Sequence, residues 1–255
     1  CDLTSEDLIT PEDMVVTLSH GGYAKAQAVS EYRAQGRGGR GRSATAMKDE
    51  DFVDKLFVAN THDTLLCFSN LGQLYWLKVY RLPKAGRGSR GKPMVNLLPL
   101  AEGEKITAVL PIKQYDDGHF VFMATRDGTV KKTPLSAFSR PRASGIIAVD
   151  LRDDDQLVDV AVTDGTREVI LFTSGGKAIR FSEEEVRPMG RDSTGVRGVK
   201  LGEGQSVIAL IVVGEGHVLT ASARGYGKLT PLEDFPVHGR GGQGVVSGAE
   251  LLSVA

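Results

Sequence analysis

The chain of 255 residues is 41% hydrophobic, which is enough to bury a large core. Its formal net charge is −1, so it is not a general polycation, and any affinity for nucleic acid must depend on where the charges lie. No apolar run approaches the roughly 18 residues of a membrane span, and the N-terminus lacks the layout of a signal peptide. The two cysteines, Cys1 and Cys67, are far apart in the sequence. We expect a reduced, cytoplasmic protein without a membrane segment.

The first thirteen residues are acidic and weakly periodic, and the chain opens on Cys1 rather than on Met. Thr10 offers a helix N-cap and Pro11 fits the first helical position, so a short turn of helix is predicted there. We expect residues 1–13 to be a linker that leads into a single domain over residues 14–255.

Thirty-one glycines and ten prolines predict many turns and short strands. Segments 15–25, 65–75, 121–131, 169–180 and 218–228 each read as a β-hairpin, in which a Gly-containing two-residue turn joins two apolar runs. The turn glycines recur at spacings of 50, 56, 48 and 49 residues, and they are Gly22, Gly72, Gly128, Gly176 and Gly225. The sequence is therefore a repeat of about fifty residues.

A second glycine follows each turn glycine at a nearly fixed offset of 17 to 19 residues, at Gly41, Gly91, Gly145, Gly195 and Gly244. Each unit then closes with an acidic stretch and another β-rich run. The approximate repeats are 14–63, 64–118, 119–165, 166–215 and 216–255. The fifth is short, because Gly244 to Leu251 spans 7 residues where Gly195 to Val207 spans 12.

About four strands per unit predict an all-β fold of blades arranged radially, an architecture that protects strand edges. The basic residues of each unit concentrate between its hairpin and its closing strand. Windows 33–42, 81–92, 126–142, 187–200 and 224–240 hold 21 of the 31 Lys and Arg but 4 of the 32 Asp and Glu. Because one position in the repeat maps to one side of a radial fold, this pattern predicts a continuous basic rim.

The basic loops are rich in glycine, as in residues 36–41 and 86–91, which allows backbone amides to approach phosphate oxygens. Few aromatic residues accompany them, so stacking on unpaired bases is not favoured. A duplex backbone, read without strong sequence specificity, is the expected ligand.

Motifs for catalysis are not supported. The G-x-G-x-x-G matches that begin at Gly36, Gly86 and Gly239 each start 14 residues after a hairpin glycine and run into a β-rich segment, not into the helix of a dinucleotide fold. The G-x-x-x-x-G-K match at 86–92 has Pro93 where Ser or Thr must hold magnesium. The five histidines are scattered singly, and the carboxylate runs at 153–155 and 183–185 are typical of solvated turns. We expect no active site, no metal and no cofactor in this chain.

The segment Gln35-Gly36-Arg37-Gly38-Gly39-Arg40-Gly41 resembles the gyrase box, the Q-R-R-G-G-K-G signature of the C-terminal domain of DNA gyrase A. Arg40 stands in the Lys place. Gly36 replaces the first Arg, which costs one phosphate contact and leaves the glycine turn intact. Segments 6–10, 58–63, 95–100 and 130–133 are similar to that family too, so the resemblance covers essentially the whole chain.

The resemblance implies a β-pinwheel, a propeller-like array of four-stranded blades that exchange strands with their neighbours, here with five to six blades. It implies that the domain wraps duplex DNA so that gyrase introduces negative supercoils. The partners would be gyrase B and the rest of gyrase A in a heterotetramer, associated with the bacterial nucleoid, and the isolated domain would be a monomer. The catalytic tyrosine, ATP and Mg²⁺ would belong to other domains.

The charge pattern and the resemblance together give one set of expected DNA contacts. They are Gln35, Gly36, Arg37, Gly38, Gly39, Arg40, Gly41, Arg42, Arg87, Arg90, Lys92, Arg140, Arg142, Arg191, Arg197 and Arg240. Two alternatives remain open. One is a propeller-like scaffold for protein–protein interaction, which would present apolar or aromatic anchors on its rim. The other is the equivalent domain of the topoisomerase IV protein that corresponds to gyrase A, in which the box is degenerate or absent.

Overall fold

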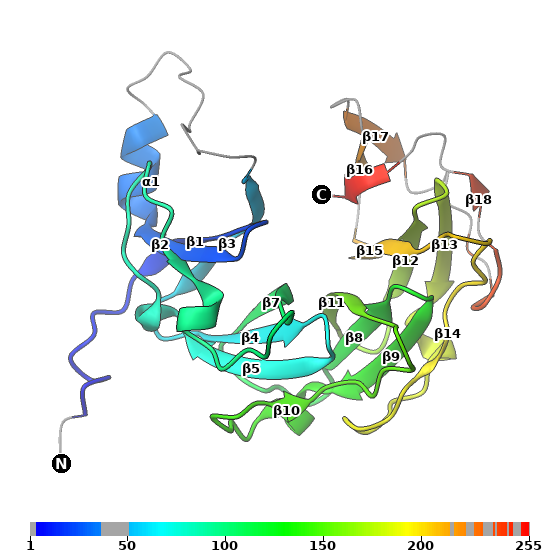
Figure 1. Ribbon diagram of the computed structural model, residues 1–255, viewed down its shortest axis with the longest axis horizontal. Helices are drawn as coiled ribbons and strands as arrows, with labels where there is room; N and C mark the ends of the chain where they lie inside the picture. The colour runs from blue at the N-terminus through cyan, green and yellow to red at the C-terminus, as the bar shows by residue number, and fades with distance from the viewer. Residues whose placement is uncertain are drawn as a thin grey trace.

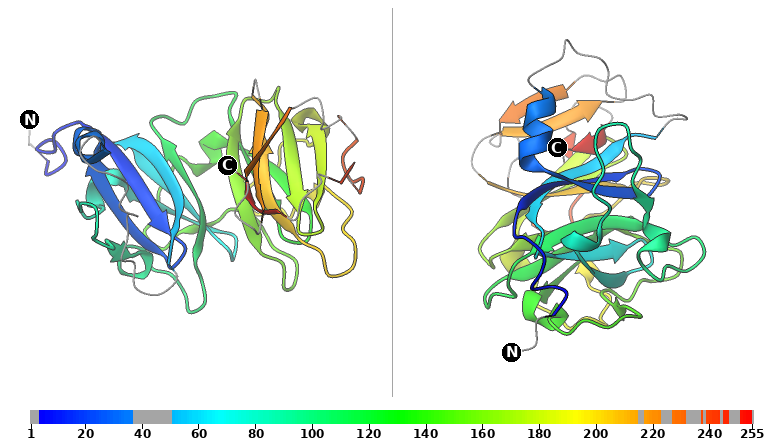
Figure 2. Two further views of the ribbon diagram at one scale, coloured as in Figure 1. Left: turned by 90° about the horizontal axis from the view of Figure 1, so that it is seen from above. Right: turned by 90° about the vertical axis from the view of Figure 1, so that its left-hand side faces the viewer.

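Five β-sheets follow one another along an open arc in the computed structural model of the chain (Figure 1). The structure describes residues 4–36, 51–214, 217–222, 227–231, 237, 239–243, 245–246 and 251–254. We call these sheets blades 1 to 5 in chain order. Seen from above, blade 1, which contains the blue strands, and blade 4, which contains the yellow-green strands, lie at opposite ends of the molecule (Figure 2, left). The predicted all-β radial architecture is confirmed.

All strand pairs within the sheets are antiparallel. From its inner to its outer edge, blade 1 contains β3 (Val53–Asn60), β1 (Asp13–Ser19), β2 (Tyr23–Ala28) and β6 (Lys92–Pro93). In the same order, blade 2 contains β7 (Ile106–Ile112), β4 (Thr64–Ser69), β5 (Gln73–Lys78) and β10 (Ile146–Ile147). Blade 3 contains β11 (Leu157–Thr163), β8 (Phe120–Thr125), β9 (Thr129–Pro134) and β14 (Val196–Arg197). Blade 4 contains β15 (Val207–Val212), β12 (Glu168–Thr173), β13 (Lys177–Ser182) and β18 (Val245–Val246). The described strands of blade 5 are β19 (Leu251–Val254), β16 (His217–Ser222) and β17 (Gly227–Pro231).

The outermost strand of each four-stranded blade is donated by the following repeat. β6 comes after β5 of blade 2 in the chain, yet it pairs with β2 of blade 1. The same exchange joins β10 to β5, β14 to β9 and β18 to β13. Figure 1 places β7, β11 and β15 toward the inside of the arc, and β10, β14 and β18 on its outside. The strand exchange implied by the family resemblance is therefore present.

In blades 1 to 4 the hairpin turns hold three residues between the strands, not the two that the sequence suggested. In blade 1 the Gly22 amide donates to the Ser19 carbonyl at 3.0 Å, and Gly22 has a φ of 86°. The Ser19 hydroxyl then accepts from the Tyr23 amide at 3.1 Å. Glycine is favoured at the last turn position because the left-handed conformation is open to it, as in a type I turn followed by a bulge.

The second glycine of the repeat is required by the strand exchange. Gly195 has a φ of 110°, and a Cβ built on it would lie 2.4 Å from the Val130 carbonyl oxygen. Gly91 and Gly145 also have positive φ, and their Cβ positions would lie 2.1 Å from the Ala24 carbonyl oxygen and 2.6 Å from the Tyr75 ring. Gly91, Gly145 and Gly195 thus allow the exchanged strand to reach its partner, whereas Gly88 of the same loop as Gly91 has no neighbour within 4 Å, and the approach of the loop glycines to phosphate stays a prediction.

The acidic stretches cap the hairpins. The Asp51 carboxylate accepts from the Gly21 amide at 2.7 Å, and the Asp155 carboxylate accepts from the Asp127 amide at 3.0 Å. In blade 2 the buried Glu104 carboxylate accepts from the hydroxyl of Tyr75 at 2.8 Å. The runs that the sequence suggested to be solvated are so in part: Asp153, Asp154, Glu184 and Glu185 are exposed, whereas Asp155 and Glu183 are buried within the fold.

The core is formed between blades, because the central strands of blades 2 and 3 each pack on both neighbouring blades. Leu65 and Cys67 on β4 face blade 1, while Leu66 and Phe68 face blade 3. Burial raises the pKa of Cys67 to about 12, so its thiol stays protonated and unreactive at neutral pH.

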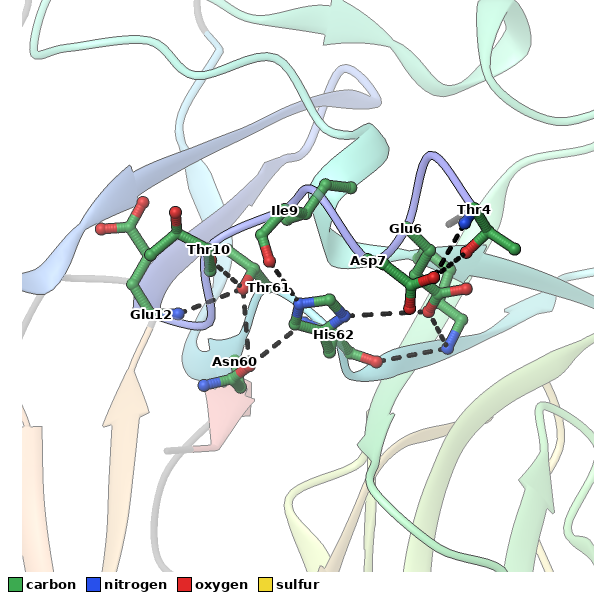
Figure 3. Close-up of polar contacts among 10 residues, drawn as sticks. Thr4, Glu6, Asp7, Ile9, Thr10, Glu12, Asn60, Thr61 and His62 are labelled. Atoms are coloured by element: carbon green, nitrogen blue, oxygen red, sulfur yellow. Dashed lines mark hydrogen bonds and ion pairs between the residues drawn. The ribbon is translucent and has the colours of Figure 1, made fainter. Parts of the chain in front are cut away.

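The lead-in is held against the turn between β3 and β4 (Figure 3). The Thr61 hydroxyl donates to the Thr10 carbonyl at 2.9 Å, and His62 Nε2 lies 2.8 Å from the Ile9 carbonyl oxygen. The predicted helical turn at Thr10 is wrong: these residues are extended against Thr61, and β1 begins at Asp13.

One α-helix, α1 (Val29–Gly36), was not anticipated. It follows β2 and stands beside β1 and β2 of blade 1 (Figure 2, right). Among the described residues no helix is both long and apolar enough to cross a membrane.

We expect Gly195→Ala to destabilise the domain more than Gly204→Ala. Both residues have positive φ, so each substitution costs about 1–2 kcal/mol of backbone strain. Gly195 abuts the Val130 carbonyl whereas Gly204 has no neighbour within 4 Å, so the clash should add about 1–3 kcal/mol at Gly195 alone. Urea unfolding of both variants measures the difference, and equal losses would contradict the role given to the exchange glycine.

Candidate nucleic-acid interface

The basic loops lie along the outer edges of the blades because of the strand exchange. The loop of repeat 2 runs beside β2 of blade 1, where the Ala26 amide donates to the Pro83 carbonyl at 3.0 Å. The loop of repeat 4 runs in the same way beside β9 of blade 3, where the Met189 amide donates to the Lys132 carbonyl at 2.7 Å. Each described loop is thus held by the preceding blade and presents its cations on the outside of the arc.

The expected site residues of the described loops are on this outer edge. The exposed ones are Arg87, Arg90, Lys92, Arg140, Arg142 and Arg197. Arg191 and Arg240 are half-buried. None of these eight side chains forms an ion pair with a carboxylate in the part of the chain that the structure describes. Their charge is therefore available to an anionic ligand.

Arg90 is positioned by blade 1. Its guanidinium lies 4.5 Å from the centre of the Tyr23 ring, a cation–π contact. Burial opposes ionisation of nearby Asp51, but hydrogen bonds from Gly21 and Ser19 and the Arg90 charge together lower the pKa of Asp51. Arg90 is thus a fixed cation at the start of the outer edge.

Arg142 and Arg191 come from consecutive repeats and line one hollow of about 610 Å³, together with Ile147 of β10. The loop of repeat 3, on blade 2, and the loop of repeat 4, on blade 3, therefore meet at this point. A path from blade to blade along the outer edge passes between these two guanidinium groups.

Lys131 lies beneath this junction and joins the two loops. Its side chain is 1% exposed, and the ammonium donates to the carbonyls of Ala148 at 2.7 Å and Arg191 at 2.5 Å. Burial lowers the pKa of Lys131 to about 8, although the charges of Asp150 and Asp192 oppose the shift.

Lys132 is buried as well, and its ammonium lies 3.4 Å from Glu183 Oε1. The inclusion of Lys131 and Lys132 in the basic rim was therefore wrong. Both belong to β9, which is covered by a neighbouring blade on each face, so they stabilise the fold rather than face solvent.

Arg240 also has a structural role. Its Nη1 donates to the Arg197 carbonyl at 2.5 Å, and its backbone amide donates to Glu185 at 3.2 Å. Its Nε is buried without a hydrogen-bond partner among the described residues. Arg240 thus fixes the loop of repeat 5 on that of repeat 4, and part of its guanidinium is already committed.

The gyrase-box segment begins at the end of α1, where Gln35 and Gly36 are the last two helical residues. The corresponding place in repeats 2 to 4 is a short 3₁₀ helix, such as η1 (Val79–Arg81). The remaining box residues and the arginine that follows the box lie outside the described residues. They are Arg37, Gly38, Gly39, Arg40, Gly41 and Arg42.

Sequence reasoning missed a second group of cations. Arg152 and Lys200, together with Arg197, line a hollow of about 340 Å³ at the hairpin end of blade 3. Arg152 directly precedes an acidic run and lies outside the basic windows, and Lys200 was counted in a basic window without a role.

The motifs considered for catalysis are not assembled among the residues that the structure describes. Among the described residues no group of three or more His, Cys, Asp or Glu is placed to hold a metal ion. The segment from Gly86 to Lys92 is an outer-edge loop that enters β6, and a 3₁₀ turn rather than an α-helix follows it. The fold and its edge define a radial, strand-exchanged β-protein that displays cations on one rim.

The family model described as the DNA gyrase C-terminal domain, β-propeller, matches residues 13–60, 63–113, 119–164, 167–214 and 216–247. The chain belongs to this family. It is 57% identical over 247 residues to the A subunit of DNA gyrase from Salmonella typhimurium, covering 96% of this chain and 28% of the relative. It is 55% identical to that of Escherichia coli K12 over the same coverage. The chain thus spans less than a third of the length of these relatives.

Two solved structures share the fold. The C-terminal domain of DNA topoisomerase IV matches with a TM-score of 0.76 at 31% identity, covering 97% of this chain and 79% of that one. The DNA gyrase A C-terminal domain matches with a TM-score of 0.76 at 28% identity, covering 96% and 81%. The backbone therefore does not separate the two enzymes, whereas the higher identity to gyrase A sequences confirms the gyrase resemblance.

We expect Lys131→Met to remove a pH dependence of stability. The folded-state pKa of Lys131, about 8, is below the ordinary 10.5, so the unfolded chain binds the proton more tightly. The parent should therefore gain stability relative to the variant as pH rises from 8 to 10.5, by roughly 3 kcal/mol, with no further change below pH 8. Urea unfolding at pH 7 to 10.5 measures this, and parallel curves for the two proteins would contradict it.

Proposed function

We propose that the outer edge of the arc binds duplex DNA by its sugar–phosphate backbones and wraps it from blade to blade. The observation that carries this proposal is the position of the loop cations. Strand exchange puts the loops of successive repeats on the same edge of successive blades, and their exposed arginines have no described carboxylate partner. A curved row of free guanidinium groups suits a polyanion that extends over several blades.

The composition of the edge favours non-specific duplex binding. Its exposed residues are mainly Arg, Lys and Gly, which contact phosphates and sugars, and few aromatic rings are present to stack on bases. A scaffold for protein partners would need aromatic or aliphatic anchors at the centre of its surface. Ile147 is an exposed apolar residue of the described edge, but it lies in the hollow shared by Arg142 and Arg191.

Bending explains why several blades must take part. Curving 20–30 bp by 40–90° costs on the order of 1–6 kcal/mol, more than one arginine–phosphate contact contributes. An arc of blades, each with its own loop cations, distributes this cost along the DNA. Fixed cations such as Arg90 add little ordering entropy to the complex, because the Tyr23 ring already restricts them.

In this proposal the domain serves a longer gyrase A protein. It would act in the cytoplasm, at the nucleoid, in a heterotetramer with gyrase B, and the isolated domain would be a monomer. The catalytic tyrosine, ATP and Mg²⁺ would be supplied by other domains. The wrap would present a distal DNA segment to the cleaved one with a fixed sign, so that strand passage yields negative supercoils.

We expect the double variant Arg37→Ala, Arg40→Ala to abolish supercoiling by the reconstituted enzyme while sparing relaxation. The box cations anchor one end of the proposed wrap, and relaxation does not need the wrap. Supercoiling of relaxed plasmid and relaxation of supercoiled plasmid are measured in parallel.

Arg33→Ala is the matched control, because Arg33 is an exposed cation on α1 just before the box. It should leave both activities unchanged. Equal loss of supercoiling and relaxation in the double variant would argue against wrapping as the role of the box.

We also expect DNA affinity to fall with salt at a log–log slope near −7, if the edge neutralises about eight phosphates. The triple variant Arg87→Ala, Arg142→Ala, Arg191→Ala removes one cation from each of three blade edges. Its slope should be shallower by about 3, because each phosphate contributes about 0.9. It should also shift the linking number of ligated nicked circles less than the parent does.

The control for this series is Lys113→Ala, Arg167→Ala, which removes two cations that are paired with Asp63 and Asp164 away from the outer edge. Its slope and topoisomer shift should match those of the parent. A parent domain that binds with a steep salt slope but leaves the linking number unchanged would bind DNA without wrapping it.

A further inference from the structure

The hollow at the hairpin end of blade 3 has a basic lining that the fold does not require. It holds about 340 Å³ and lies where the exchanged strand β14 meets the turn before β11. Three exposed cations line it: Arg152, Arg197 and Lys200. The main chain around them is fixed, since the Asp155 amide donates to the Arg152 carbonyl at 2.9 Å and the Lys200 amide to the Gly242 carbonyl at 2.7 Å.

The two carboxylates of the hollow are already engaged. Asp155 is 7% exposed and accepts from the backbone amides of Asp127 and Gln156 at 3.0 and 2.8 Å. Asp127 is paired with Arg126 at 3.2 Å. Arg152, Arg197 and Lys200 form no ion pair with any described carboxylate. The hollow therefore carries an excess of positive charge.

Blade 2 contains the same backbone without these charges. The hydrogen bond from the Asp155 amide to the Arg152 carbonyl has an equivalent in blade 2, the hydrogen bond from the Glu104 amide to the Ala101 carbonyl. Ala101 is therefore the counterpart of Arg152. Arg197 pairs with Thr129 as Ile147 pairs with Gln73.

Lys200 has an acidic counterpart in blade 2. It follows Val199, whose amide donates to Gly128, just as Asp150 follows Val149, whose amide donates to Gly72. Three formal positive charges in blade 3 thus replace one negative charge in blade 2 on one scaffold.

The other counterparts that the structure describes carry no charge. They are Pro93 and Asn96 in blade 1, and Gly202 and Val246 in blade 4. Packing and hydrogen bonding are therefore satisfied without cations at these positions, and the charges of blade 3 are free to act on a ligand.

We infer that the hollow lined by Arg152, Arg197 and Lys200 on blade 3 is a phosphate site for the DNA backbone. Arg197 belongs both to the outer edge and to this hollow, so the two are continuous. The loop from Pro188 to Arg197 descends along β9 from the middle of the blade to its hairpin end. Arg191 and Arg197 therefore present cations at different heights of one blade, as the two strands of a duplex require.

The inference rests on the proposed DNA-binding function and deepens it. The test variant is Arg152→Ala, Lys200→Ala, which leaves Arg197 in place. The fold accepts alanine at the position of Arg152, since Ala101 is its counterpart in blade 2. Its affinity for a linear duplex should decrease, and its log–log salt slope should be shallower by about 2. Arg152→Lys, Lys200→Arg keeps the charges and should restore the parent slope, and urea unfolding checks that each variant is folded.

The controls separate this inference from the proposed function. Lys113→Ala, Arg167→Ala removes the same amount of charge elsewhere and should bind as the parent does. If the triple outer-edge variant binds weakly while Arg152→Ala, Lys200→Ala behaves like this control, the hollow is not a DNA site and the proposed function stands. If neither set of variants alters DNA binding, both fail. Inorganic phosphate is also tested as a ligand of the parent domain. If it binds in the hollow while Arg152→Ala, Lys200→Ala leaves the DNA affinity unchanged, the hollow is a site for free phosphate and the inference is overturned.

Discussion

The structure depends on a very short strand pairing: two residues from one repeat complete the sheet of the blade before it. This pairing is sterically possible because a glycine precedes the exchanged strand and lets it approach the neighbouring backbone, as Gly195 does at Val130. The loop that leads to the exchanged strand must then run along the outer edge of that blade. The same contact thus closes the sheet edge, links successive blades and places each described basic loop on the outside of the arc.

A chain of almost zero net charge displays a basic edge because its charges are divided between two tasks. Blades 1, 2 and 3 each use an acid to satisfy amides or hydroxyls at the hairpin end, namely Asp51, Glu104 and Asp155, whereas Gln205 holds the equivalent position in blade 4. These carboxylates stabilise turns and are removed from the outer surface. The loop cations receive no equivalent structural partner from the described carboxylates, so the edge remains positive. The position of charge within the repeat decides the surface potential, and the total does not.

The repeat period and its glycines could be predicted from the sequence because a fixed spacing reports the architecture directly. The burial of Lys131 and Lys132 could not, because the alternation of a strand predicts exposure only when one face of the sheet meets solvent. Here β9 lies between two neighbouring blades, so both of its faces are covered. The helix α1 and the extended lead-in were missed for a related reason: their conformations are set by contacts with β1, β2 and Thr61, which are distant from the local sequence signals.

Because the blades share a backbone but differ in their side chains, the strength of ligand binding can differ from blade to blade. Blades 2 and 3 share the hydrogen bonds that shape their hairpin ends, yet one carries Ile147 and Asp150 where the other carries Arg197 and Lys200. Because none of these side chains is needed to hold the exchanged strand, charge can be added or removed there at little cost in stability. In the proposed wrap, DNA would be bent by the sum of unequal contacts, so the local curvature would depend on which blades hold phosphate most tightly. The periodic fold would then set the path of the DNA, and the departures from periodicity would set where along it the bending force is greatest.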